Sequence, residues 1–161
     1  MTGLQTVERS DTISLAALTE EVFCDLDPVA DKHQIRLIQT EGDCTVTGSY
    51  ILLYRAVYNL VENAIKYNRP SGSVTVNIHS AESAVLKVTD TGIGISPENQ
   101  EKIFDPFYRV DKSRSRAMGG AGLGLALVSE IARQHNGQVK VTQSSEKGST
   151  IALILPESTD Y

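Results

Sequence analysis

Polar side chains recur on one face of a predicted helix near the middle of the chain. Asn59, Asn63 and Lys66 follow one another at spacings of four and three residues, which places them on one helical face. An amide oxygen is a hard, neutral ligand that suits Mg²⁺, and a lysine can contact a phosphate as a point charge. Tyr67 follows directly and can lay its ring against a base. The same pattern also fits the solvated face of an ordinary amphipathic helix.

A carboxylate followed by glycines ends a predicted strand. Asp90 precedes Gly92, Gly94 and Ile95. An ionised carboxylate only accepts hydrogen bonds, so it can take an amino hydrogen of adenine. The glycines can adopt positive φ and let a flat ring approach the backbone. An ordinary turn after a strand uses the same residue types, so this segment alone does not decide between the two.

A glycine-rich segment, residues 119–125, opens another predicted helix. Backbone N–H groups at a helix start attract anions, and glycines let phosphates come close. A Walker A loop is excluded because Gly124 is followed by Leu125 and not by Lys-Ser/Thr. A dinucleotide-binding fingerprint is excluded because residues 112–118 do not form a predicted strand. A flexible hinge is the alternative.

A long segment with one short helical patch, residues 98–103, and no other periodicity joins the two glycine-rich regions. It contains an aromatic patch, residues 104–109, in which Arg109 can bind a phosphate bidentately. The aromatics also fit a small hydrophobic cluster that pins a loop. So long a loop is uncommon in a compact domain unless it is functional, so we expect residues 96–119 to form a mobile lid.

The remaining pattern predicts helices interspersed with mostly antiparallel strands. We expect a first helix that begins at Ser14 and kinks or restarts at Pro28, a second over residues 49–67, and a third after Gly124 that Asn136-Gly137 ends. We expect strands over residues 35–40, 73–80, 84–90, 138–144 and 150–155. Together they predict an α+β fold, a two-layer sandwich with a mixed, mostly antiparallel sheet covered on one face by three helices.

Composition narrows the classes of function. The 161 residues fit one domain, and 15 Lys+Arg against 20 Asp+Glu give a net charge of −5, which argues against a nucleic-acid binder. No apolar run approaches the roughly 18 residues of a membrane span, so we expect no membrane contact and a cytoplasmic setting. Cys24 and Cys44 form no CxxC pair, which excludes a disulfide framework and a cysteine zinc site.

In order and spacing, the four segments resemble the N, G1, F and G2 boxes of the ATP-binding catalytic domain of sensor histidine kinases. This family shares the Bergerat ATP-binding fold with DNA gyrase, Hsp90 and MutL. The resemblance covers residues 14–156, and Gly148-Ser149-Thr150 looks like the family's Gly-Thr before its last strand. It implies that residues 1–13 are the remnant of a linker from a helical hairpin domain, and that residues 157–161 are a tail.

The resemblance also implies roles for single residues. Asn63 matches the Mg²⁺ ligand, and Asn59 the position that is a glutamate base in the gyrase-like ATPases. An amide cannot take a proton at neutral pH, so hydrolysis should be slow. Glu62 is a candidate for positioning the acceptor histidine. The remaining matches to catalytic or nucleotide contacts are Lys66, Tyr67, Asp90, Gly92, Gly94, Ile95, Arg109, Gly120, Gly122, Leu123 and Gly124.

The implied activity is that of a protein histidine kinase. The domain would bind ATP with Mg²⁺ and transfer the γ-phosphoryl group to a histidine on a separate dimerisation domain, for relay to a response regulator. The resemblance implies a cytoplasmic domain of a membrane-anchored sensor, monomeric in isolation. The alternatives within the fold are a gyrase- or MutL-like ATPase module and a noncatalytic module that senses adenine nucleotide. His33, His79 and His135 do not match the acceptor motif.

Overall fold

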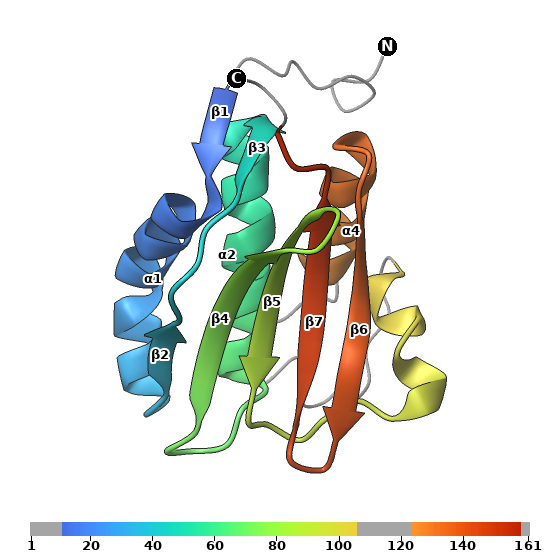
Figure 1. Ribbon diagram of the computed structural model, residues 1–161. Helices are drawn as coiled ribbons and strands as arrows, with labels where there is room; N and C mark the ends of the chain where they lie inside the picture. Colours follow the sequence, from blue (N-terminus) through green and yellow to red (C-terminus); the bar gives the residue numbers. More distant parts are fainter. Residues whose placement is uncertain (1–10, 106–123, 159–161) are drawn as a thin grey trace.

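The computed structural model describes residues 11–105 and 124–158 (Figure 1). Its strands are β1 (Asp11–Ser14), β2 (Arg36–Gln39), β3 (Thr45–Gly48), β4 (Ser73–Ser80), β5 (Ala84–Asp90), β6 (Gln138–Ser145) and β7 (Gly148–Leu155). Its α-helices are α1 (Leu15–Lys32), α2 (Tyr50–Lys66) and α4 (Gly124–Gln134). Two 3₁₀-helices, η1 (Pro97–Asn99) and η2 (Lys102–Phe104), follow β5.

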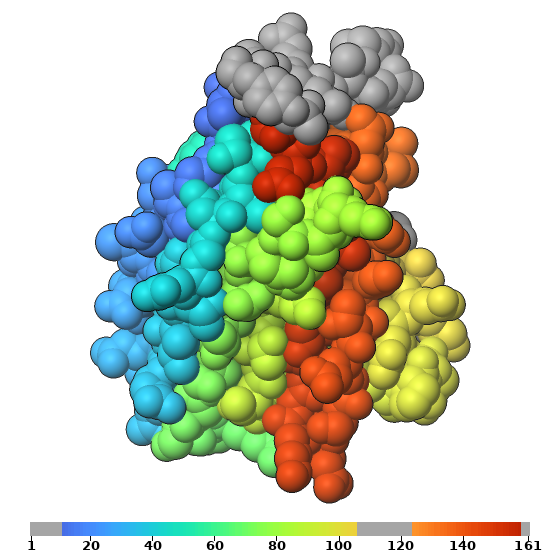
Figure 2. Space-filling view, viewed as in Figure 1, coloured from blue at the N-terminus to red at the C-terminus, as the bar shows by residue number. Residues whose placement is uncertain are grey.

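Five strands form a mixed sheet in the order β2-β4-β5-β7-β6. The β2–β4 pair is parallel and the other three pairs are antiparallel. The helices α1, α2 and α4 lie behind this sheet in Figure 1, and atoms of β4, β5 and β6 form much of the face toward the viewer in Figure 2. The predicted two-layer sandwich with a mostly antiparallel sheet is therefore confirmed.

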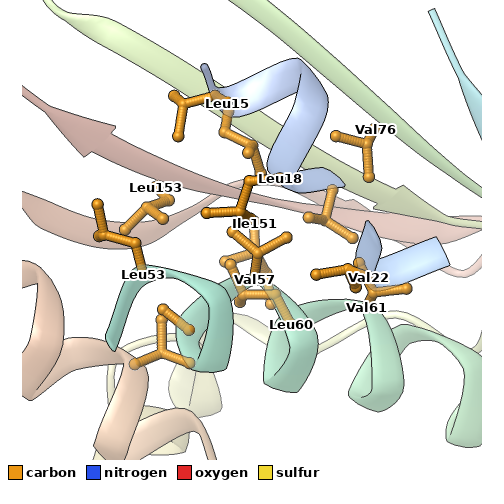
Figure 3. Close-up of a cluster of buried hydrophobic side chains, with 14 of the residues drawn as sticks. Leu15, Leu18, Val22, Leu53, Val57, Leu60, Val61, Val76, Ile151 and Leu153 are labelled. Carbon is orange, nitrogen blue, oxygen red and sulfur yellow. The ribbon is translucent and has the colours of Figure 1, made fainter. Parts of the chain in front are cut away.

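The core lies between the helical layer and the sheet. Strand alternation sends Val74, Val76 and Ile78 of β4 toward the helices, where all three are buried. Figure 3 shows the contact of α1, α2 and the sheet, formed by Leu15, Leu18, Val22, Leu53, Val57, Leu60, Val61, Val76, Ile151 and Leu153. Each fully buried side chain of this size contributes roughly 1.5–3 kcal/mol. This core holds α2 and the ends of β5 and β7 in fixed positions.

Side-chain caps begin the first two helices where the sequence predicts. Ser14 Oγ accepts a hydrogen bond from the backbone N–H of Ala17 at 3.1 Å, and Ser49 Oγ accepts one from Leu52 at 3.3 Å. The first helix does not restart at Pro28, because α1 runs unbroken to Lys32 with Pro28 on its exposed side. Burial of Leu26 and Ala30 on either side of the proline holds the helix against the sheet despite the missing N–H.

Residues outside the predicted limits of 14–156 belong to the described fold at both ends. Residues 11–13, assigned above to a linker, belong to β1, which pairs antiparallel with the equally unexpected β3. Each has only four residues, which leaves little room for a period of two, and β1 lies in a stretch whose polar composition indicated a linker. At the other end, Ser158 donates its backbone N–H to the Thr45 carbonyl at 2.7 Å. The helical patch expected within residues 98–103 is instead the two short 3₁₀-helices.

None of the helices in the described part of the chain combines the length and the apolarity that a bilayer crossing requires.

Candidate nucleotide-binding site

The carboxylate of Asp90 lies at the end of β5, next to the start of β7. Its Oδ1 accepts a hydrogen bond from Gly92 N–H at 2.8 Å, and its Oδ2 accepts one from Ser149 Oγ at 2.9 Å. Burial raises the pKa of this carboxyl, although the bonds from Gly92 and Ser149 oppose that shift. Each carboxylate oxygen has two acceptor positions, so acceptor capacity remains for an amino group. The side chain is thus fixed in orientation and can still accept a hydrogen bond from a ligand.

The glycines after Asp90 let the loop pack closely against its neighbours. A Cβ on Gly92 would lie 2.4 Å from the carbonyl oxygen of Tyr67. Gly94 has φ +77°, and a Cβ there would lie 2.0 Å from the carbonyl oxygen of Ser145. The loop is therefore pressed between the end of α2 and the end of β6. Ile95, further along, donates its N–H to Ser144 Oγ at 2.7 Å.

The predicted polar face of α2 is formed. Asn59, Asn63 and Lys66 are all half-buried on this helix, and Tyr67 is its C-cap residue. Glu62 lies 3.7 Å from the Lys66 ammonium as an i,i+4 ion pair, with both side chains partly exposed. The pair is weak at such exposure, so Lys66 remains available to a ligand phosphate.

The start of α4 meets this polar face. Asn59 Nδ2 donates to the carbonyl of Gly124 at 3.4 Å, and Gly124 is the first residue of α4. The first turn of a helix has unpaired N–H groups and a partial positive charge, which favour an anion there. The structure thus joins the polar face of α2 to the helix that follows the glycine-rich segment.

Four predicted site residues lie outside the described part of the chain: Arg109, Gly120, Gly122 and Leu123. The segment expected to be a lid falls largely there as well.

The donor chemistry of α2 fits a cation held mainly by phosphates. Within residues 11–105 and 124–158 the Asn63 amide has no hydrogen-bond partner. In the same ranges no group of three His, Cys, Asp or Glu side chains is placed to hold a metal. Mg²⁺ typically takes one or two protein oxygens, with water and substrate phosphates filling the other positions. One amide oxygen is therefore compatible with Mg²⁺ that enters together with a nucleotide.

Ser149 is a residue of the site that the pattern did not single out. Its side chain holds Asp90 Oδ2, because Asp90 and Ser149 are paired in the register of β5 and β7. The two are 59 positions apart in the chain, and strand register cannot be read from a single sequence. The Gly-Ser-Thr segment before the last strand was the only signal.

A polar cluster beside the Asp90 loop was also not predicted. Asn68 is buried, at 9% exposure. Its Oδ1 accepts from Thr91 Oγ1 at 2.9 Å, and its Nδ2 donates to the Ser73 carbonyl at 2.9 Å. The cluster ties the end of α2 to the start of β4 and to the loop that follows Asp90.

Comparison with known proteins gives consistent matches. Residues 48–159 match the family model described as "Histidine kinase-, DNA gyrase B-, and HSP90-like ATPase". The sensor-like histidine kinase SenX3 of Mycolicibacterium smegmatis is 37% identical over 161 residues, which cover 98% of this chain and 42% of SenX3. The sensor histidine kinase RppB of Synechocystis sp. is 44% identical over 140 residues, which cover 86% of this chain and 30% of RppB. The chain thus spans less than half the length of these curated relatives.

Solved structures share the fold over nearly the whole chain. The mycobacterial sensor histidine kinase MprB has a TM-score of 0.77 at 28% identity, covering 91% of this chain and 97% of the MprB chain. Full-length ShkA, solved in complex with AMPPNP, has a TM-score of 0.80 at 25% identity, covering 96% of this chain and 32% of ShkA. Together with the match over residues 48–159, these likenesses place the chain in the family of histidine kinase-, DNA gyrase B- and HSP90-like ATPases.

Proposed function

We propose that this chain is the ATP-binding catalytic domain of a two-component sensor histidine kinase. It binds ATP with Mg²⁺ and transfers the γ-phosphoryl group to a histidine of a separate helical dimerisation domain. The single observation that carries the proposal is the Asp90 carboxylate. It is oriented by Gly92 and Ser149, retains acceptor capacity, and lies at one end of a site whose other end has phosphate-binding chemistry.

The adenine end of the site is formed by Asp90 and its loop. Asp90 accepts a hydrogen bond from the exocyclic amino group, while Gly92, Gly94 and Ile95 let the ring approach the backbone. The ring of Tyr67 lies against the base. ShkA, a relative of the same fold, is described as a complex with the ATP analogue AMPPNP, which supports nucleotide binding at this fold.

The phosphate end is formed by α2 and by the start of α4. Asn63 supplies one oxygen to Mg²⁺, and Lys66 contacts a phosphate oxygen. Gly124, next to Asn59, brings the first backbone N–H groups of α4 toward the triphosphate. By resemblance, Gly120, Gly122 and Leu123 extend this cradle, and Arg109 reaches the γ-phosphate.

The reaction is an in-line displacement at the γ-phosphorus. Bound Mg²⁺ neutralises phosphate charge, and the protein contributes mainly positioning and electrostatic stabilisation. A neutral imidazole nitrogen attacks the γ-phosphorus, the bond from that phosphorus to the oxygen that bridges to the β-phosphate breaks, and ADP leaves with the bridging oxygen. Asn59 stands where a gyrase-like ATPase has a glutamate base. Since an amide accepts no proton at neutral pH, water is not activated and the histidine is the favoured nucleophile.

The wider role of the protein follows the same proposal. The phosphohistidine passes its phosphoryl group to an aspartate of a response regulator. One structural neighbour, ThkA, is described as a complex with a response regulator protein, at 22% identity and with a TM-score of 0.74. We place the domain on the cytoplasmic side of a membrane-anchored sensor. Within the domain, we place Glu62 beside the incoming histidine.

Phosphoryl transfer in trans tests the proposal. The chain is incubated with Mg²⁺ and γ-labelled ATP, alone and with a separately produced helical hairpin domain from the full-length kinase. We expect no label on the chain alone and acid-labile, base-stable label on the hairpin. Asn63→Ala should abolish the transfer, whereas Asn77→Ala, on the open sheet face, should not. Rapid ATP hydrolysis with no label on the hairpin would instead favour the ATPase alternative.

A further inference from the structure

A closed hydrogen-bond cluster joins three parts of the fold beside the candidate nucleotide site. Its members are Asn68 after α2, Ser73 at the start of β4, and Thr91 directly after Asp90. Thr91 Oγ1 accepts from the Ser73 N–H at 2.9 Å and donates to Asn68 Oδ1 at 2.9 Å. Asn68 Nδ2 donates to the Ser73 carbonyl at 2.9 Å, and Thr91 N–H donates to the same carbonyl at 3.3 Å.

The cluster leaves little room for the loop to move. A Cβ on Gly72 would lie 2.4 Å from both Asn68 Oδ1 and Thr91 Oγ1. Asn68 Oδ1 also accepts from the backbone N–H of Arg69 at 2.8 Å. The oxygen and the nitrogen of the Asn68 side-chain amide are both hydrogen-bonded. Rotation of this side chain would therefore break several bonds at once.

The position of Thr91 connects the cluster to the Asp90 carboxylate. Gly92 N–H, which holds Asp90 Oδ1 at 2.8 Å, belongs to the peptide unit that joins Thr91 to Gly92. Because Thr91 is fixed on both its backbone N–H and its hydroxyl, that peptide unit is fixed as well. The same contacts set the distance between the loop and the end of α2, which carries Lys66 and Tyr67.

We propose that Thr91 and Asn68 are positioning residues that act through Asp90 to set the adenine end of the site relative to α2. This inference rests on the proposed function, since it concerns the affinity of the same site for ATP. Neither side chain needs to touch the nucleotide. The Thr91 hydroxyl donates its single hydrogen to Asn68 and accepts from Ser73, so we expect its contribution to binding to be indirect.

Calorimetry with a non-hydrolysable ATP analogue and Mg²⁺ tests the inference. We expect Thr91→Val to raise Kd by roughly 3- to 10-fold, the range of about one hydrogen bond, and Thr91→Ser to restore the wild-type value. Thr89→Val is the matched control. It removes a hydroxyl from β5, two residues before Thr91, where Thr89 Oγ1 lies 2.9 Å from Thr150 Oγ1, and should leave Kd unchanged.

A double-mutant cycle separates positioning from a general structural role. If Thr91 acts through Asp90, Thr91→Val should change Kd by less than about twofold in an Asp90→Asn background. An equal loss in both backgrounds, or wild-type affinity of Thr91→Val, would overturn this inference alone. Absence of binding by the wild-type chain would overturn the proposed function and this inference with it.

Discussion

His135 Nε2 accepts a hydrogen bond at 3.1 Å from the backbone N–H of Ser49, the N-cap residue of α2. Nε2 can accept only without a proton, so the ring is the neutral tautomer whose Nδ1–H donates to the Ile131 carbonyl at 2.8 Å. The ring is buried at 3% exposure. A single side chain thus fastens the end of α4 to the beginning of α2, the two helices that form the phosphate end of the site.

Replacing this ring should weaken the fold markedly. His135→Ala leaves the Ser49 N–H without its acceptor and opens a cavity, so we expect a loss of about 2–4 kcal/mol in the free energy of unfolding. Urea denaturation followed by circular dichroism measures it. His33→Ala, at the partly exposed C-cap of α1, should change stability by less than about 0.5 kcal/mol. Equal effects of the two variants would contradict the role given to His135.

Alanine substitutions at two glycines of the candidate site should have opposite effects on the stability of the fold. Gly94→Ala places a Cβ 2.0 Å from the Ser145 carbonyl oxygen at φ +77°, so we expect at least about 2 kcal/mol of destabilisation and weaker ATP binding. Around Gly124 the nearest atom that the described residues offer to an added Cβ is 3.9 Å away, in Asn59. Since alanine favours a helix over glycine, Gly124→Ala should keep or raise the melting temperature. Thermal unfolding of both variants checks the pair, and a stable Gly94→Ala protein would refute the close contact.

Asp90 should cost the free protein some stability at neutral pH. Burial raises the pKa of its carboxyl in the folded state above the ordinary value of 3.8. Above the folded-state pKa the buried charge therefore opposes folding, and this penalty is relieved as the pH falls through that pKa. We expect Asp90→Asn to be at least as stable as the wild type at pH 7, with its advantage shrinking toward pH 4. Urea midpoints of both proteins at both pH values measure the difference. A larger stability advantage of Asp90→Asn at pH 4 than at pH 7 would contradict the prediction.

The sequence predicts the long elements and misses what depends on register. β4 and β5 have the predicted bounds. Buried and partly exposed residues alternate along β4, whereas β5 begins with three consecutive buried residues and is recognised by its apolar content. The short β1 and β3 were missed, as was the bond from Ser149 to Asp90 across two neighbouring strands. Such contacts join residues far apart in the chain, and no local pattern encodes them.

The candidate site was predicted because chemistry and spacing agree within short segments. Asn59 and Asn63 share one face of α2, and Asp90 ends β5 before its glycines. The interaction of Asn59 with Gly124, 65 residues away, was not predicted, because it depends on how α2 packs against α4. The structural role of His135 was not predicted. Its ring accepts a hydrogen bond from the backbone of another helix, a contact between distant segments that no local pattern indicates.

The affinity of the wild-type chain and of Asp90→Asn for ATP with Mg²⁺, measured by calorimetry, tests the central claim most directly. A hydrogen bond to a buried charged group contributes about 1.5–3 kcal/mol, so the variant should bind roughly 10- to 150-fold more weakly. GTP, which has an oxygen in place of the amino group, should bind the wild type poorly because that oxygen faces a carboxylate. Equal ATP affinity of the two proteins, or equal affinity of the wild type for ATP and GTP, would contradict the assignment of Asp90 to the adenine site.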